Sequence, residues 1–249
     1  EWWEACCSKH PFVAIAAPRG FAKSTAITFT YVLAKGLFKE SAFCIIVSDS
    51  ESQATLFLND IKKELTDNDD LRKLFGVVGF EKDAETDIIV RFEDNKLFRI
   101  MAKGSEQKLR GLKWANKRPD LIVCDDMEND ELVMNKERRL KFKKWFNSAL
   151  LPVRSDTGIV RIVGTILHYD SLLNSLMPSI TARTTVNTPL KMWSTVNSGW
   201  YSLLYRAHDK DYKHLLWAEK LDDVALKRIR EIYEHQGLLD VYAQEYLNN

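Results

Sequence analysis

Short apolar runs alternate along the first part of the chain with longer segments in which apolar residues recur every third or fourth position. The runs are almost wholly apolar, so we expect strands buried on both faces of a sheet. They cover residues 11–17, 42–47, 119–124 and 158–163. The periodic segments predict helices at 23–38, 50–65, 135–150 and 170–177. Strands alternating with helices indicate an α/β fold with a mostly parallel central sheet flanked by helices.

Two further features complete this outline. Residues 87–92 and 96–101 flank Asp94-Asn95 and predict a β-hairpin. After about residue 188 the pattern changes to one strand and two helices, at 200–207, 222–234 and 238–247. We therefore expect a core at 1–188 and a small lid or linker subdomain at 189–249.

Composition narrows the class of protein. Of the 249 residues, 45% are hydrophobic and 29% charged, which is typical of a globular protein. The net charge of +1 excludes a histone-like polycation but leaves room for local basic patches that bind nucleic acid. No apolar run reaches the ~20 residues of a membrane span, so no membrane partner is expected. The four cysteines lack metal-ligand spacing and fit a reducing compartment.

The first residues give one more expectation. Glu1-Trp2-Trp3-Glu4 has neither an initiator Met nor a signal-peptide pattern. We therefore expect the chain to be a piece of something longer.

The strongest chemical signal follows the first predicted strand. Ala17-Pro18-Arg19-Gly20-Phe21-Ala22-Lys23-Ser24-Thr25 lies between a strand and a helix, which is the context of a phosphate-binding (Walker A) loop. Its backbone N–H groups and the following helix N-terminus would cradle phosphates. Lys23 would contact the β- and γ-phosphates, and the Ser24 hydroxyl would bind Mg²⁺. The strict pattern has Gly at positions 17 and 22, so an ordinary strand–turn–helix remains the alternative.

A second signal lies at the end of a later strand. Residues 120–124 lead into Asp125-Asp126-Met127-Glu128, an acidic strand end of the Walker B kind. In P-loop enzymes the first carboxylate holds the Mg²⁺ shell and a neighbour polarises the attacking water. Asp125 fits the first role, and either Asp126 or Glu128 could take the second. A solvated acidic turn is the alternative.

These motifs together resemble the ATPase domain of the large terminase subunit, the DNA-packaging motor of tailed bacteriophages. The resemblance is carried by residues 17–25, 109–111, 119–128, 162–165 and 242–249. It implies a P-loop NTPase of the ASCE type. ATP and Mg²⁺ would be its cofactors, and ATP hydrolysis would drive double-stranded DNA into a procapsid.

The resemblance also implies roles for single residues. Arg19 would lie near the terminal phosphate, and Arg110 would be presented to a neighbour's nucleotide. Gly164-Thr165 matches a coupling motif that senses hydrolysis, although Thr165 could equally just end a strand. Trp2 and Trp3 resemble a remnant of the segment that clamps adenine.

Partners and location follow from the same resemblance. They are copies of the chain in a ring on the portal, the portal protein and the small terminase subunit. The location would be the host cytoplasm and, transiently, the procapsid. The family also carries a nuclease domain, but this chain ends before it, so we expect no nuclease activity.

Two basic segments have several possible uses. One contains Lys108, Arg110, Lys113, Lys117 and Arg118 without an acidic residue among them. The other is the predicted helix, with six cations at 136, 138, 139, 141, 143 and 144. Either could contact DNA phosphates, form a solvated face or lie between subunits.

Other functions remain open at this stage. A helicase would need a second motor domain or further motifs. A nucleotide-gated assembly module would bind ATP with little turnover, and a phosphate-release assay would separate it from a motor.

Overall fold

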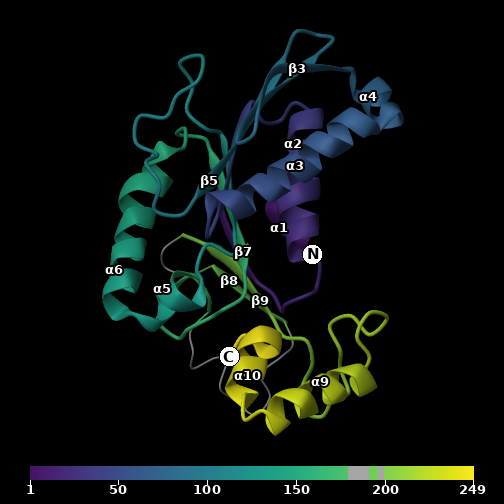
Figure 1. Cartoon of the computed structure of the whole chain (residues 1–249), viewed down its shortest axis with the longest axis vertical. Coiled ribbons are helices and arrows are strands. Elements are labelled where there is room, and N and C mark those ends of the chain that lie inside the picture. The colour runs from purple at the N-terminus through teal and green to yellow at the C-terminus, as the bar shows by residue number, and fades with distance from the viewer. Residues whose placement is uncertain (179–190, 196–198) are drawn as a thin grey trace.

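The computed structural model describes residues 1–178, 191–195 and 199–249, and these form one nine-stranded sheet with helices around it (Figure 1). The strand order is β3-β4-β5-β2-β6-β7-β1-β9-β8. The strands are β1 (Phe12–Ala16), β2 (Phe43–Ser48), β3 (Val77–Ala84), β4 (Asp87–Phe92), β5 (Leu97–Gly104), β6 (Leu121–Asp125), β7 (Ile159–Gly164), β8 (Lys191–Thr195) and β9 (Tyr201–Tyr205).

The sheet is parallel in the middle and antiparallel at both edges. The six central strands, in the order β5-β2-β6-β7-β1-β9, run parallel to one another. Strands β4 and β3 extend the sheet beyond β5, and β8 extends it beyond β9, by antiparallel pairing. Strand β7 lies between β1 and β6, with Ala16 opposite Gly164 and Asp125 opposite Val163. Because these three strands are parallel, their carboxyl ends meet at one edge of the sheet. The predicted α/β fold with a mostly parallel sheet is confirmed.

Helices cover both faces of the sheet. Successive side chains of a strand point to opposite faces, and both sets are apolar in the central strands. One face packs against α1 (Trp2–Cys7), the π-helical η1 (Thr25–Tyr31), α2 (Val32–Leu37) and α3 (Glu51–Asp67). The other packs against α5 (Asp130–Met134), α6 (Lys136–Trp145), η2 (Phe146–Leu150), η3 (Leu151–Val153) and α7 (Leu172–Ser175). In β1, Val13 and Ile15 face the first layer and Ala14 and Ala16 the second.

The C-terminal helices α9 (Asp223–His235) and α10 (Leu239–Leu247) lie together below the sheet in Figure 1. The predicted boundary at residue 188 lies outside the described residues. Strands β8 and β9, which we assigned to the second unit, add to the sheet of the first because β9 pairs with β1.

The sequence predicted most element positions within a few residues. The Ser50 hydroxyl caps α3 by accepting from the Gln53 backbone N–H at 3.2 Å, as expected for a helix beginning there. Six elements were not predicted: α1, α4 (Asp69–Phe75), β3, α5, η3 and β8. Among the described residues no helix is long and apolar enough to cross a membrane.

Candidate functional site

The loop after β1 has the left-handed backbone that a tight phosphate loop needs. Gly20 has φ +78° and Ala22 has φ +60°. For Ala22, which stands where the strict pattern has Gly, this conformation costs about 1–2 kcal/mol. Ala17 has an ordinary backbone and donates its N–H to the Gly164 carbonyl at 3.0 Å. The chain therefore adopts the loop without its two usual glycines, and only Ala22 is strained.

Lys23 comes directly after the loop and points at the acidic strand end. Its ammonium lies 3.4 Å from Asp126 Oδ2, and its side chain is only 8% exposed. Asp126 Oδ1 accepts from the Thr165 backbone N–H at 3.1 Å. The structure thus brings three predicted residues from three segments into one contact chain.

Asp125 and Ser24 lie side by side beneath this pair. Ser24 Oγ donates to Asp125 Oδ1 at 3.1 Å, and Thr28 Oγ1 donates to Asp125 Oδ2. Thr28 was not predicted from the sequence, although its spacing of four residues from Ser24 puts both on one helix face. Burial, together with the neighbouring charge of Asp126, raises the pKa of Asp125 to about 7.

This oxygen set fits a magnesium ion. Mg²⁺ prefers hard oxygen ligands and usually takes one or two protein groups, with phosphate and water completing its shell. Ser24 and Asp125 supply a hydroxyl and a carboxylate oxygen of this kind. In the described part of the chain no cluster of three His, Cys, Asp or Glu forms a dedicated all-protein metal site.

The carboxyl end of β7 connects the two halves of the site. The Val163 carbonyl accepts the Asp126 N–H at 3.0 Å, and the Thr165 hydroxyl donates to the Ala17 carbonyl at 3.3 Å. A Cβ on Gly164 would lie 3.1 Å from both Asp126 Oδ1 and Leu173 Cδ2. Position 164 therefore allows the close approach of Asp126 that a side chain would hinder.

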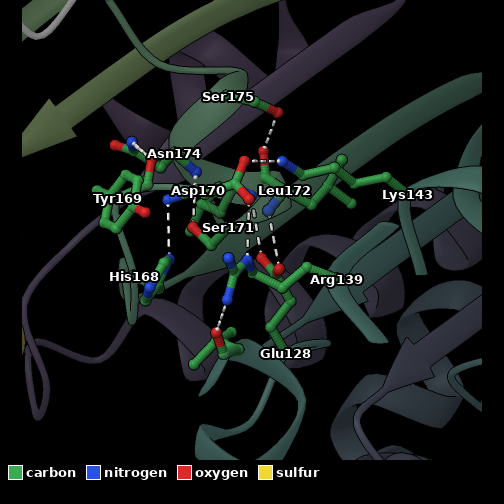
Figure 2. A network of polar contacts seen from close by, with 12 residues as sticks. Glu128, Arg139, Lys143, His168, Tyr169, Asp170, Ser171, Leu172, Asn174 and Ser175 are labelled. Carbon is green, nitrogen blue, oxygen red and sulfur yellow. Dashed lines mark hydrogen bonds and ion pairs between the residues drawn. The ribbon is translucent and has the colours of Figure 1, made fainter. Parts of the chain in front are cut away.

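Glu128 faces another part of the molecule. Its two carboxylate oxygens accept the backbone N–H groups of Leu172 and Leu173 at 2.8 and 3.0 Å (Figure 2). Burial raises its pKa, against the opposing effect of these two bonds. The carboxylate thus caps α7, and among the described residues it contacts neither Lys23 nor Ser24.

The two predicted arginines are also separated. Arg19 Nη1 lies 3.3 Å from Glu245 Oε1 of α10, although 70% of the arginine side chain is exposed. Arg110 is exposed in the loop between β5 and β6 and makes no hydrogen bond or ion pair with the described residues. Neither arginine contacts the Lys23–Asp126 pair.

The last turns of α10 hold the phosphate loop from the other side, which was not predicted from the sequence. The Arg19 N–H donates to the Glu245 carbonyl of α10 at 2.9 Å. Lys220, which precedes α9, donates from its Nζ to the Gly20 carbonyl. Asn248 Oδ1 accepts from the Ile166 N–H at 2.9 Å, just beyond Gly164-Thr165. One C-terminal segment therefore contacts both the loop and the end of β7.

An aromatic cavity opens beside the loop. Its volume is about 560 Å³, and it is lined by Trp2, Trp3, Phe21, Ala22 and Trp217, among others. Such flat apolar side chains can pack on a planar ring such as a nucleotide base. Trp217, from a segment far along the chain, was not predicted for this role.

Solved structures of other proteins share this fold. The large terminase ATPase domain of Thermus phage P74-26 superimposes with a TM-score of 0.64 at 15% identity, covering 100% of this chain and 92% of that one. The chain has the fold of a large terminase ATPase domain. The fold agrees with the α/β architecture expected from the sequence and with the resemblance to large terminase ATPase domains stated there.

A second terminase extends the comparison. The large terminase of another thermophilic bacteriophage, in complex with ADP, gives a TM-score of 0.52 at 11% identity. The match covers 100% of this chain but 51% of that protein. The scan of known protein families and the search of curated proteins gave no match.

Proposed function

We propose that this chain is an ATP-hydrolysing motor domain of a viral DNA-packaging terminase. The observation that supports this best is the meeting of Lys23, Ser24, Asp125 and Asp126 at one edge of the sheet. A point charge, a metal-binding pair and a carboxylate for water are the parts that phosphoryl transfer to water requires. The second terminase, with the same fold, is described in complex with ADP.

Each residue then has a distinct task. Lys23 pairs with Asp126 in this structure, and we propose that the ammonium turns to the β- and γ-phosphates when nucleotide binds. Ser24 and Asp125 would hold Mg²⁺, which neutralises charge on the transferred phosphoryl group. Residues 18–25 would supply the backbone cradle and helix N-terminus that bind the phosphate oxygens.

Asp126 is the better candidate for orienting the attacking water. It is half-exposed, and the Thr165 N–H fixes one of its oxygens. Glu128 uses both its oxygens on α7. A general base must lie within hydrogen-bond reach of the water, so we assign this task to Asp126 and a structural one to Glu128.

The finer steps concern coupling and assembly. Gly164 and Thr165 contact both the loop and Asp126, and we propose that they pass the state of the nucleotide to the rest of the domain. Arg19 would turn from Glu245 to the terminal phosphate, and Arg110 would act on a neighbouring subunit's nucleotide. Double-stranded DNA, further copies of the chain, the portal protein and the small terminase subunit are the proposed partners, acting in the host cytoplasm and on the procapsid.

A phosphate-release assay with and without DNA tests the proposal. We expect Mg²⁺-dependent turnover that rises with protein concentration, because an arginine supplied by a neighbour requires assembly. Arg110→Ala and Lys23→Ala proteins should each be inactive and regain activity when mixed. ATP binding without turnover in the assembled parent would instead favour a nucleotide-gated module, for which the hold of α10 on the loop provides a gate.

A further inference from the structure

The loop between β5 and β6, residues 105–118, is firmly anchored on the sheet; we call it the basic loop. Leu109 is 1% exposed, and Leu112 and Trp114 pack against the same core layer. The Gln107 carbonyl accepts from Trp145 Nε1 of the adjoining helix layer at 3.0 Å. Inward apolar residues thus hold this segment against the sheet along its length.

A tight turn closes the far end of the basic loop. Trp114 and Lys117 exchange backbone hydrogen bonds of 2.9 and 2.8 Å around Ala115 and Asn116. Both central residues have positive φ, +46° and +61°, as a type I′ turn requires. The turn is therefore a built element with a fixed shape, and it fixes where Lys117 lies.

Apart from Glu106, which pairs with Lys141, every charged side chain of the basic loop is a cation. Lys108, Arg110, Lys113 and Lys117 are exposed, and no acidic residue lies between Gln107 and Pro119. None of the four forms an ion pair with the described residues. Unpaired cations on a fixed backbone keep their full charge for an external anion.

The other basic segment, α6, is different. Four of its six cations are already paired: Arg138 with Glu131, Lys141 with Glu106, and both Arg139 and Lys143 with Asp170. Only Lys136 and Lys144 remain exposed without an ion pair among the described residues. Similar composition thus gives one free row of cations and one largely neutralised helix.

Further lysines lie beside the turn at Ala115 and Asn116. Lys117 and Trp114 line a cavity of about 400 Å³ together with Lys39 and Lys96. Lys96 also lies 3.4 Å from Asp94, so it is partly neutralised. The free cations therefore form a strip rather than a single point, which suits an extended polyanion.

We propose that the basic loop binds the phosphate backbone of duplex DNA. This rests on the proposed packaging function for the identity of the polyanion. Lysine contacts to phosphate carry no sequence information, so binding would be sequence-independent. The only aromatic residue of the loop is Trp114, whose half-buried ring packs on Phe43. Single-stranded DNA is bound through exposed aromatic side chains on which bases stack, so duplex is preferred.

A matched pair of double variants tests the proposal. Lys113→Ala/Lys117→Ala removes two unpaired lysines from the basic loop, and Lys136→Ala/Lys144→Ala removes two from α6. Arg110 stays in place because of its proposed catalytic role. Fluorescence anisotropy with a short labelled duplex, titrated with KCl from about 50 to about 200 mM, gives affinity and salt dependence.

We expect the basic-loop variant to bind at least about tenfold more weakly, with the slope of log K against log salt reduced by about 2. The α6 variant should stay within about twofold of the parent, and Lys113→Arg/Lys117→Arg should restore binding. Equal losses in both variants, no duplex binding by the parent, or tighter binding of a single strand of the same length would each overturn the proposal.

Phosphate release measured on the same proteins keeps the two proposals apart. Basal hydrolysis should be the same in the parent and the basic-loop variant, since neither lysine contacts the nucleotide site. Hydrolysis without duplex binding would refute only the basic loop. Duplex binding through the basic loop by an inactive parent would refute the ATPase.

Discussion

Two sides of one turn show how differently the molecule uses neighbouring carboxylates. Asp125 and Asp126 face the phosphate loop, where they meet Ser24, Thr28 and Lys23. Glu128, two residues further on, faces the opposite helix layer and caps α7. Residue type alone would favour Glu128 for water activation. Backbone direction instead places Glu128 where it holds α7. This is why we proposed the shorter Asp126 for water activation.

Lys23→Ala should have the largest effect on the loop side of this comparison. It removes the point charge on the transferred phosphates, so hydrolysis should fall by at least about 10²–10³-fold. Phosphate release measures the rate, and circular dichroism checks that the fold persists. Turnover at the parental rate would show that the loop is not a phosphate cradle.

Asp126→Asn and Glu128→Gln test the comparison directly. The first should lower hydrolysis by about 10²–10⁴-fold while ATP still binds. The second should leave hydrolysis within a few-fold but lower the free energy of unfolding by about 1–3 kcal/mol, because a buried acceptor becomes a donor facing two N–H groups. Urea unfolding and phosphate release separate the two effects, and a reversed pattern would return the catalytic role to Glu128.

Asp125→Asn should raise the free energy of unfolding at neutral pH and weaken nucleotide binding. Burial raises the pKa of Asp125 from 3.8, the value for an exposed carboxyl group, to about 7 in the folded protein. Between these two pH values the native state therefore binds a proton at Asp125 that the unfolded state does not. The contribution of Asp125 to the free energy of unfolding therefore falls as pH rises from about 4 to about 7. Above this window the variant should be more stable by up to about 4 kcal/mol, and the gain should vanish near pH 4.

The same substitution should weaken Mg²⁺-dependent nucleotide binding. Thermal unfolding across pH, with and without Mg-ATP, measures both effects in one series. A variant less stable than the parent at pH 8 would contradict the assigned burial penalty.

Ala22→Gly should give the smallest effect. Glycine removes the left-handed strain but gains freedom in the unfolded chain, so a net stabilisation of about 0.5–1 kcal/mol is expected. Gly20→Ala is the matched control and should destabilise the protein, because φ is +78° there. No atom lies within 4 Å of the added Cβ, so the loss would report backbone strain alone. If both changes destabilise, the loop is held by contacts of Ala22 rather than strained by its backbone.

Local signals predicted seven of the nine described strands, most helices and the loop after β1, because each of these depends on neighbouring residues. Strand β3 escaped notice because Val77–Ala84 mixes apolar and charged residues without alternation and pairs with β4 through bulges. The role of Glu128 depends on amides 44 residues away. The contacts of Glu245 and Asn248 depend on where a distant helix packs. Such pairings have no signature in local sequence.

The hold of α10 on the site has a mechanical consequence. Through Glu245 and Asn248 the same helix binds the phosphate loop and the residue after Thr165. Any ligand that loosens these contacts weakens the attachment of α10, and by thermodynamic reciprocity a pull that detaches α10 raises the affinity for that ligand by the same factor. Tension on α10 and ligand binding at the loop thus shift the same equilibrium, between attached and detached α10.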